Sequence, residues 1–287
     1  MIWRLFFKQG EGDKMKLSCL PVSFFPELIS RRMSIEEWAQ IGVEAGLDAI
    51  DIGMLMIKAH TPVYLADYRK KIESSGMSVC MVTTYPDFSH PNQIERERQL
   101  EFLRSDIAVA SSLGARYVRV TAGQAHPETK ILDGINWVIE NLKRASETAD
   151  KFGIKLVYEN HSKPGAWEYT DFSLPTDIFL QIVEGIEDSS IGINFDTANP
   201  IVYGDDPVDL LNRIIHRVTT VHANDTSTSG TLNSVLLGTG LVPFKEIFEV
   251  LKKSEFDGWI CIEEASNLGR DGILKASQFV RDMWSGL

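Results

Sequence analysis

Short apolar runs alternate with longer amphipathic stretches from residue 15 to the end of the sequence. Each apolar run is typical of a buried strand, and each amphipathic stretch has apolar residues at the spacing of a helix face. The predicted strands cover residues 16–22, 47–52, 77–83, 115–121, 154–158, 191–195, 218–221 and 258–262. The predicted helices cover residues 35–45, 62–74, 94–113, 131–152, 175–187, 207–215, 243–253 and 271–284.

Residues that favour helix ends mark the boundaries of these elements. Ser34 lies three residues before Glu37, which is the spacing of a capping box, and it opens the first helix. Pro62 begins the second helix, where the missing N–H of a proline removes no hydrogen bond. Gly46 and Gly76 follow the two helices and stand just before the next strand. These signals support a strict order of strand, helix, strand.

Strands that alternate with helices are usually parallel, because each helix returns the chain to the same edge of the sheet. About eight such units in 287 residues fit an α/β fold, a (β/α)8 TIM barrel in one domain. An open doubly wound sheet is the competitor, but the expected glycine-rich phosphate loop does not follow the first strand. We expect the barrel to span residues 15–287, and residues 1–14 to form a peripheral tail.

The composition limits the partners of the protein. The formal net charge is −11, which opposes binding to DNA or anionic membranes because such binding needs Lys and Arg. No apolar run approaches the roughly 20 residues that a membrane span requires. Cys19, Cys80 and Cys261 lie in separate apolar runs and are expected to be buried free thiols. We therefore expect a cytoplasmic protein that binds neither nucleic acid nor membrane.

Acidic, amide and imidazole side chains follow the last four predicted strands. In residues 191–200, for instance, an apolar run leads into Asp196 and the chain then turns at Asn199 and Pro200. The C-terminal ends of adjacent barrel strands converge on the face that carries the active site in TIM barrels. The candidates at these ends are Glu159, His161, Asp196, Asn199, His222, Asp225, Glu263 and Glu264. A subset of two Glu, one Asp and one His from these strand ends would suit Mn²⁺, Mg²⁺, Co²⁺ or Zn²⁺ as metal ligands.

Simpler structural roles are open for each candidate. Asp196 and Asp225 are common residue types at turns and helix starts, where a carboxylate accepts backbone hydrogen bonds. His161 has an alternative role as a donor to a carbonyl of its own loop. Only one of Glu263 and Glu264 points into the barrel, because neighbours on a strand alternate faces, and alternation alone does not decide which.

Five short segments, in order, resemble the xylose-isomerase-like TIM-barrel superfamily. They are YENHS, FDTANP, VHANDT, LLGTGLVPF and FDGWICIEE. They are similar in particular to the sugar phosphate isomerase/epimerase family, which includes D-tagatose 3-epimerase, hydroxypyruvate isomerase and inosose dehydratase-like enzymes. The resemblance extends over the barrel from residue 15 onward and is strongest from the fifth to the eighth strand.

The resemblance implies a single divalent metal ion and a pair of catalytic glutamates. Glu159, Asp196, His222 and Glu263 match the family's metal ligands, and Glu263 is preferred over Glu264 because the family's Glu closes the segment that begins at Asp257. Glu159 and Glu263 would be the acid/base pair. A metal that holds a carbonyl and its neighbouring hydroxyl acidifies the intervening C–H, so a proton can move through a cis-enediolate.

The substrate contacts are less clear, because several positions depart from the family's pattern. Asn199 stands where the epimerases have His, Asp225 begins a segment that lacks their Arg, and Asn224 replaces a Lys found elsewhere in the family. Lys163 and Arg119 are the candidates for the missing cation. We expect His161, Asn199, Asp225 and Lys163 to contact a neutral sugar or polyol.

The expected activity is therefore that of a metal-dependent sugar isomerase or epimerase, with homo-oligomerisation open. A metal-dependent dehydratase or lyase of a keto-sugar or inosose is the alternative, because both reactions begin with the same proton abstraction. A non-catalytic sugar-binding barrel is a further alternative. An apurinic-site nuclease is disfavoured, because its extra zinc-binding histidines are replaced by Asn199, Leu232 and Ser234.

Overall fold

The computed structural model describes residues 15–287, and the predicted tail at residues 1–14 lies outside the described residues. Eight parallel strands form one sheet in the order β1-β8-β7-β6-β5-β4-β3-β2. The strands are β1 (Lys16–Leu20), β2 (Ile50–Gly53), β3 (Val79–Thr83), β4 (Tyr117–Val120), β5 (Lys155–Glu159), β6 (Gly192–Asp196), β7 (Val218–Ala223) and β8 (Trp259–Glu263). The sheet curls into a nearly closed barrel, which confirms the predicted fold class.

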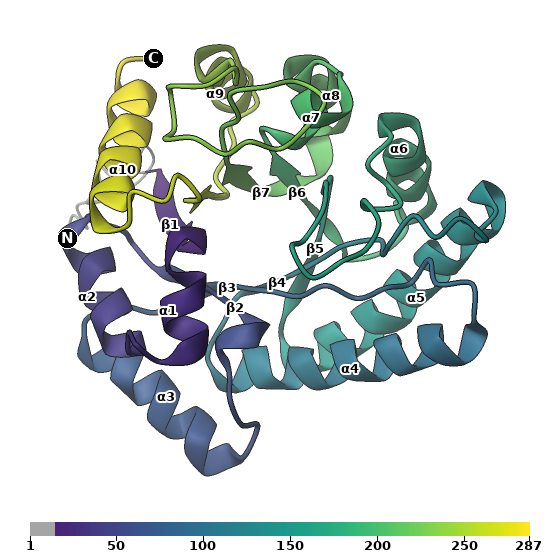
Figure 1. The fold of residues 1–287 in the computed structure, drawn as a ribbon, viewed down its shortest axis with the longest axis horizontal. Coiled ribbons are helices and arrows are strands. Elements are labelled where there is room, and N and C mark those ends of the chain that lie inside the picture. The colour runs from purple at the N-terminus through teal and green to yellow at the C-terminus, as the bar shows by residue number, and fades with distance from the viewer. Residues whose placement is uncertain (1–14) are drawn as a thin grey trace, which may run out of the picture.

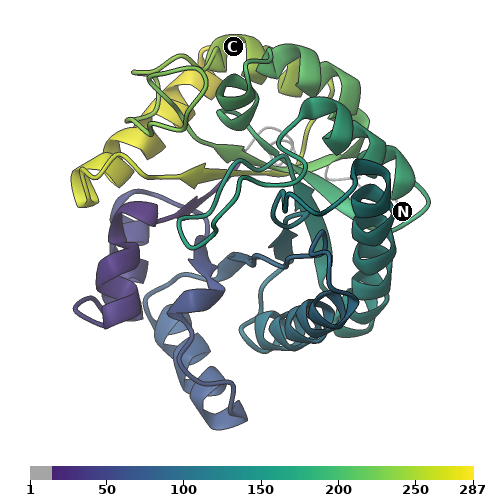
Figure 2. The same cartoon turned by 45° about the vertical axis from the view of Figure 1, so that its right-hand side comes forward.

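Helices surround the strands and cover the outer face of the sheet (Figures 1 and 2). They are α1 (Phe25–Ser30), α2 (Ile35–Glu44), α3 (Pro62–Ser74), α4 (Gln93–Ser112), α5 (Ile131–Phe152), α6 (Thr176–Gly185), α7 (Asn199–Tyr203), α8 (Pro207–Ile214), α9 (Phe244–Lys253) and α10 (Arg270–Ser285). Large side chains on their inner faces, such as Trp38, Phe179 and Phe248, are fully buried in the main core. The barrel is thus held by the helix layer packed against the sheet.

The predicted boundaries of the long helices agree with the structure. The ranges of α3 and α5 are the predicted ones. The capping box of α2 is present, with the Glu37 amide donating to Ser34 Oγ at 3.1 Å and the Ser34 amide donating to Glu37 Oε2 at 2.7 Å. The short helices α1 and α7 were missed, because neither has a capping side chain or a length that shows a helical period.

The strands β1 and β2 meet without a backbone ladder in the described part of the chain, and we call this junction the seam. Ser18 Oγ donates to Asp51 Oδ2 across the seam at 2.7 Å, and the Met81 amide of β3 donates to Asp51 Oδ1 at 3.0 Å. Also at the seam, the Asp48 amide donates to the Leu17 carbonyl at 2.8 Å. Burial raises the pKa of Asp51 to about 6 despite these contacts. A buried carboxyl therefore bridges the two strands in place of a ladder.

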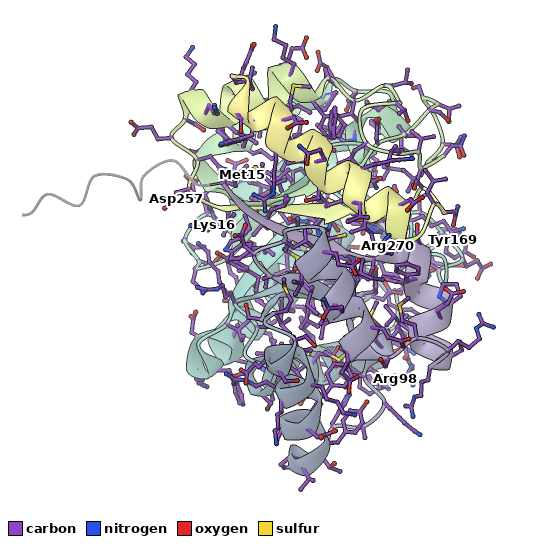
Figure 3. All side chains as sticks on the ribbon, turned by 90° about the vertical axis from the view of Figure 1, so that its left-hand side faces the viewer. Met15, Lys16, Arg98, Tyr169, Asp257 and Arg270 are labelled. Carbon is purple, nitrogen blue, oxygen red and sulfur yellow. The ribbon has the colours of Figure 1, made fainter. Side chains whose placement is uncertain are left out.

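The two ends of the strands form two different faces of the barrel. Figure 3 shows Lys16 and Asp257, which lie where β1 and β8 begin, on one side of the molecule. Tyr169 and Arg270, which follow the C-terminal ends of β5 and β8, lie on the opposite side. The three cysteines are buried free thiols, as predicted. No helix in the described residues is long and apolar enough to cross a membrane.

Candidate metal centre

Four adjacent strands bring four predicted ligands together at the C-terminal face of the barrel. Glu159, Asp196 and Glu263 are the last residues of β5, β6 and β8, and His222 lies one residue before the end of β7. Asp196 and His222 are directly paired in the register of β6 and β7. One possible ligand atom from each of the four side chains lies within 4.8 Å of those of the other three. The strand-end pattern seen in the sequence thus becomes one compact group.

His222 lies between the two glutamates of this group. Its Nδ1 is 2.6 Å from Glu159 Oε1 and 3.1 Å from Glu263 Oε2. Burial alone would lower the pKa of His222, but the two carboxylates raise it well above its usual value. Burial raises the pKa of Asp196, and the nearby Glu263 and Glu159 raise it further. Three carboxylates therefore meet at one buried point, where they disfavour one another's ionised forms, and a bound cation would relieve this repulsion.

Glu159 is held on both carboxylate oxygens. Arg119 Nε of β4 lies 3.0 Å from Oε2, and Asn194 Nδ2 of β6 donates to Oε1 at 2.8 Å. Asn194 is fixed in turn, because Thr220 Oγ1 of β7 donates to its Oδ1 at 2.7 Å. Burial alone would raise the pKa of Glu159, but Arg119 and His222 outweigh it and lower the pKa to about 2. Glu159 is thus a fixed, ionised carboxylate.

Asp196 has one satisfied oxygen and one oxygen without a partner. The amides of Ala198 and Asn199 each donate to Oδ1 at 2.8 Å. The Asn160 side chain accepts from the Asp196 amide and donates to the Asp196 carbonyl. Oδ2 is buried and has no hydrogen-bond partner in the described part of the chain. Since a buried polar oxygen without a partner is costly, this atom fits a metal ligand.

The charges of the group fit a divalent cation. With a metal bound, the three carboxylates of Glu159, Asp196 and Glu263 would carry three negative charges and His222 would be neutral, while the buried cation Arg119 contacts Glu159. Three negative charges against one positive charge leave two to be balanced. A divalent ion supplies these two charges, and the oxygen-rich donors with one imidazole suit Mn²⁺, Mg²⁺, Co²⁺ or Zn²⁺.

Aromatic rings form a wall beside the group. The ring of His161 lies edge-on to Tyr85 and Trp167, with centroids 6.0 and 6.4 Å away. Arg119 stacks on the Tyr85 ring, with its guanidinium carbon 4.3 Å from the ring centroid. Burial lowers the pKa of His161 to about 4; the charge of Glu159 opposes this shift, and the charge of Arg119 adds to it. The predicted contact residue His161 therefore lies next to the predicted metal ligands.

Asn199 and Lys163 lie in different surroundings. Asn199 is buried at the start of α7, where its Nδ2 donates to the Asn160 carbonyl at 3.0 Å. It lines a cavity of about 10 Å³, which is near the lower limit for one water molecule and too small for a sugar. Lys163 is exposed, and its Nζ donates to the Glu168 carbonyl of the same loop at 3.0 Å. Contact of either residue with substrate remains a prediction.

Asp225 holds a loop. Its Oδ1 accepts from the amides of Thr226 at 2.9 Å and Val242 at 3.2 Å, and its Oδ2 accepts from Gly238 at 2.9 Å and Gly240 at 2.8 Å. Gly240 must be a glycine here, because a Cβ would lie 2.3 Å from Asp225 Oδ1. We call these contacts the carboxylate clasp. The predicted substrate contact of Asp225 stays untested, and its hydrogen bonds favour a structural role.

The structure separates Glu263 from Glu264 and adds residues that the sequence analysis did not assign. Glu264 is buried outside the group, and its Oε1 accepts from the Ser266 amide at 3.0 Å. Arg119 was considered only as a substitute cation, and Asn194 was not considered. Both lie inside the barrel, and Asn194 precedes Asp196 by two residues, so strand alternation could have identified it.

The chain matches a family model described as "Xylose isomerase-like TIM barrel" over residues 39–283. An inosose dehydratase of Clostridium botulinum (strain Alaska E43 / Type E3) is 25% identical over 287 aligned residues, which cover 88% of this chain and 90% of that protein. The comparison therefore extends over nearly the whole barrel.

Two solved structures have the same fold. A D-tagatose 3-epimerase-like protein superposes with a TM-score of 0.76 at 21% identity and covers 94% of this chain and 97% of its own. An IolI protein with a bound zinc atom superposes with a TM-score of 0.76 at 17% identity and covers 95% of this chain and 99% of its own. At these identities the likeness shows the architecture alone.

Proposed function

The chain belongs to the xylose isomerase-like TIM barrel family, and we propose that it is a divalent-metal-dependent enzyme of keto-sugars or related polyols. Its reaction begins with removal of a proton beside a carbonyl group. We further propose that the reaction ends with loss of water, as in a dehydratase. The observation that carries this choice is the unequal environment of Glu159 and Glu263.

Glu159, Asp196, His222 and Glu263 would hold the metal. A bound divalent cation would polarise the substrate carbonyl and acidify the neighbouring C–H. Support for a divalent ion comes from the charge balance of the site, from the unpartnered Asp196 Oδ2, and from the zinc atom in the IolI protein. Mn²⁺, Mg²⁺, Co²⁺ and Zn²⁺ are all compatible with the donor set.

Glu263 is the better placed of the two glutamates to accept the proton. Its side chain is 17% exposed and contacts His222 Nδ1, whereas Glu159 is fully buried. Glu159 Oε1 accepts from Asn194, and Oε2 forms an ion pair with Arg119, so the negative charge of Glu159 is stabilised. A carboxylate stabilised in this way is a weak base.

One available glutamate favours dehydration over epimerisation. Epimerisation at a carbon needs a second acid on the opposite face, and this would have to be Glu159. In dehydration, Glu263 takes the proton from carbon, the electron pair forms a C=C bond, and the hydroxyl on the next carbon leaves. His161, beside the site, gives the leaving hydroxyl its proton, so that water departs and no oxidant is needed. The inosose dehydratase of Clostridium botulinum supports this outcome.

Isomerisation or epimerisation is the second candidate. Glu159 and Glu263 come from different strands and approach the same point, as an acid/base pair on two faces of a substrate would. The likeness to a D-tagatose 3-epimerase-like protein supports this candidate. Homo-oligomerisation and the absence of nucleic-acid binding remain predictions.

The test is a panel of inososes and ketoses given to the metal-loaded protein in D₂O. Dehydration predicts a product lighter than the substrate by one water molecule. Deuterium beside the carbonyl without loss of mass would favour the second candidate. Glu263→Gln should lower turnover by about 100-fold, while Glu249→Gln, on the exposed side of α9, should not change it. Absence of both products from every substrate, with metal bound, would overturn the proposal.

A further inference from the structure

Two buried polar atoms without hydrogen bonds face each other beside the metal centre. Nδ1 of His161 and Oδ2 of Asp171 lack a hydrogen-bond partner among residues 15–287. The two atoms are 3.9 Å apart, and their side chains are 10% and 0% exposed. A buried polar atom without a partner is uncommon, and two such atoms at this separation point to an interaction between them.

The direction of the Asp171 carboxyl is fixed by its own loop. Its Oδ1 accepts from the amide and the hydroxyl of Ser173, each at 2.8 Å. The Asp171 amide donates to the Ser162 carbonyl at 2.6 Å, and this bond closes the base of the loop between β5 and α6. Oδ2 is therefore the oxygen left for an outside partner.

His161 is confined as well. Tyr85 and Trp167 lie edge-on against its ring and limit its rotation. Because Nδ1 is buried, the small exposure of the side chain belongs to the rest of the ring, which includes Nε2. If Nδ1 forms a hydrogen bond within the protein, Nε2 is the ring nitrogen available to contact a substrate at the metal centre.

We propose that Asp171 is a positioning residue whose Oδ2–H donates a hydrogen bond to Nδ1 of His161 and so leaves a proton on Nε2, directed at the substrate. This inference rests on the proposed function. The proposal requires the two atoms, 3.9 Å apart here, to come within hydrogen-bond distance when substrate is bound, and catalytic hydrogen bonds are often long in the free enzyme.

A protonated carboxyl makes Asp171 a donor. Burial raises the pKa of Asp171 to about 8, so the acid form is the main one at neutral pH. During dehydration, Nε2–H passes its proton to the leaving hydroxyl, and the proton of Asp171 passes to Nδ1. The imidazole stays neutral, Asp171 becomes a carboxylate, and the proton count is balanced. This arrangement differs from the usual Asp–His pair, in which the carboxylate accepts from the imidazole.

The tautomer of His161 tests the proposal without a substrate. The full chain is loaded with Zn²⁺, its histidines are labelled with nitrogen isotope, and proton–nitrogen correlation spectra are recorded. His161→Gln assigns the signal among the six histidines. We expect the Nε2–H tautomer in the unaltered protein. Asp171→Asn should keep this tautomer, because the amide N–H also donates to Nδ1, whereas Asp171→Leu should lose it.

Turnover should separate positioning from folding. Asp171→Asn should lower kcat by about 100-fold with KM unchanged, because an amide has no proton to pass on. Asp177→Asn, the same change at an exposed residue of α6, should leave both unchanged. An Nδ1–H tautomer in the unaltered protein, or an unchanged tautomer in Asp171→Leu, would overturn the proposal. The tautomer is read without turnover, so failure of the proposed function would leave this result intact.

Discussion

The metal centre and the carboxylate clasp lie at the same face of the barrel, and each is built on a buried aspartate. Asp196 ends β6, and Asp225 lies two residues after β7 ends. Both side chains are fully buried. All the oxygens of Asp225 accept backbone amides, whereas Oδ2 of Asp196 has no hydrogen bond in the described chain.

We infer that the difference separates a carboxylate proposed to bind a metal from a structural one. Residue type, depth and position on the strand are nearly the same, so none of them distinguishes the two. The count of satisfied oxygens does, because a buried carboxylate is stable only when its charge is matched by donors or by a cation. The charge of Asp225 is matched by amide donors of its own loop, whereas the charge of Asp196 needs a further donor or a cation.

The largest expected effect follows from removal of Asp196. Asp196→Ala should abolish metal binding and lower turnover at least about 1000-fold, since a bound metal would supply several kcal/mol of transition-state stabilisation. Elemental analysis of the dialysed protein and steady-state kinetics measure both effects. Retention of a stoichiometric metal ion in this variant would contradict the assignment of Asp196 as a ligand.

The second effect concerns the buried cation of the site. Arg119→Met leaves Glu159 without its charge partner and should lower both turnover, by about 100-fold, and the free energy of unfolding, by about 4 kcal/mol. Chemical denaturation and kinetics are the measurements. Arg98→Met is the matched control, because Arg98 is an exposed residue of α4 paired with Glu95, and it should change little. An unchanged stability for Arg119→Met would show that the buried pair is not needed.

The third effect tests the clasp. Asp225→Asn has a single acceptor oxygen and leaves buried amides of the 226–242 loop unbonded, which should cost about 4 kcal/mol of unfolding free energy. Metal content should not change, and turnover should stay within about threefold. Urea denaturation and metal analysis give the two numbers. A large loss of turnover with stability intact would instead support the predicted substrate contact of Asp225.

The smallest effect belongs to Asp51 at the seam. Its pKa is about 6 in the folded protein and about 3.9 when unfolded, so the folded state binds its proton more tightly. The stabilisation is fully present below about pH 4 and is lost as the pH rises to about 6, at a cost of about 2 kcal/mol. Asp51→Asn should remove this part of the pH dependence. Stability profiles of the two proteins that run parallel between these pH values would refute the assignment.

Most of the fold could be predicted from the sequence, because glycine and proline signals mark the ends of α2, α3 and α5. The short helices α1 and α7 also have a proline in their first turn, and α7 ends at Gly204, but five or six residues are too few to show a helical period. For the site, the strand-end rule placed Asp196 and its three partners on one face. Alternation left Glu263 and Glu264 undecided, and the resemblance favoured Glu263, which the structure places in the group.

The remaining features depend on how loops fold, which periodicity does not describe. The pairing of His161 with Asp171 joins residues at the two ends of one irregular loop. The structural role of Asp225 depends on hydrogen bonds from backbone amides as far along the chain as Val242. Such contacts are invisible to a pattern of apolar and polar positions, since they depend on backbone direction rather than on side-chain type.

The seam gives the barrel one preferred place for local opening. Within residues 15–287, β1 and β2 share no ladder. On this side of the barrel, α10 is joined to the end of α2: Ser277 Oγ donates to the Ala45 carbonyl at 2.7 Å, and Arg270 Nε donates to Glu44 Oε2 at 2.8 Å. In hydrogen exchange, the amides along the seam should therefore lose protection together and before those of β5 to β8. The ladders among β5 to β8 would stay intact while the junction between β1 and β2 opens.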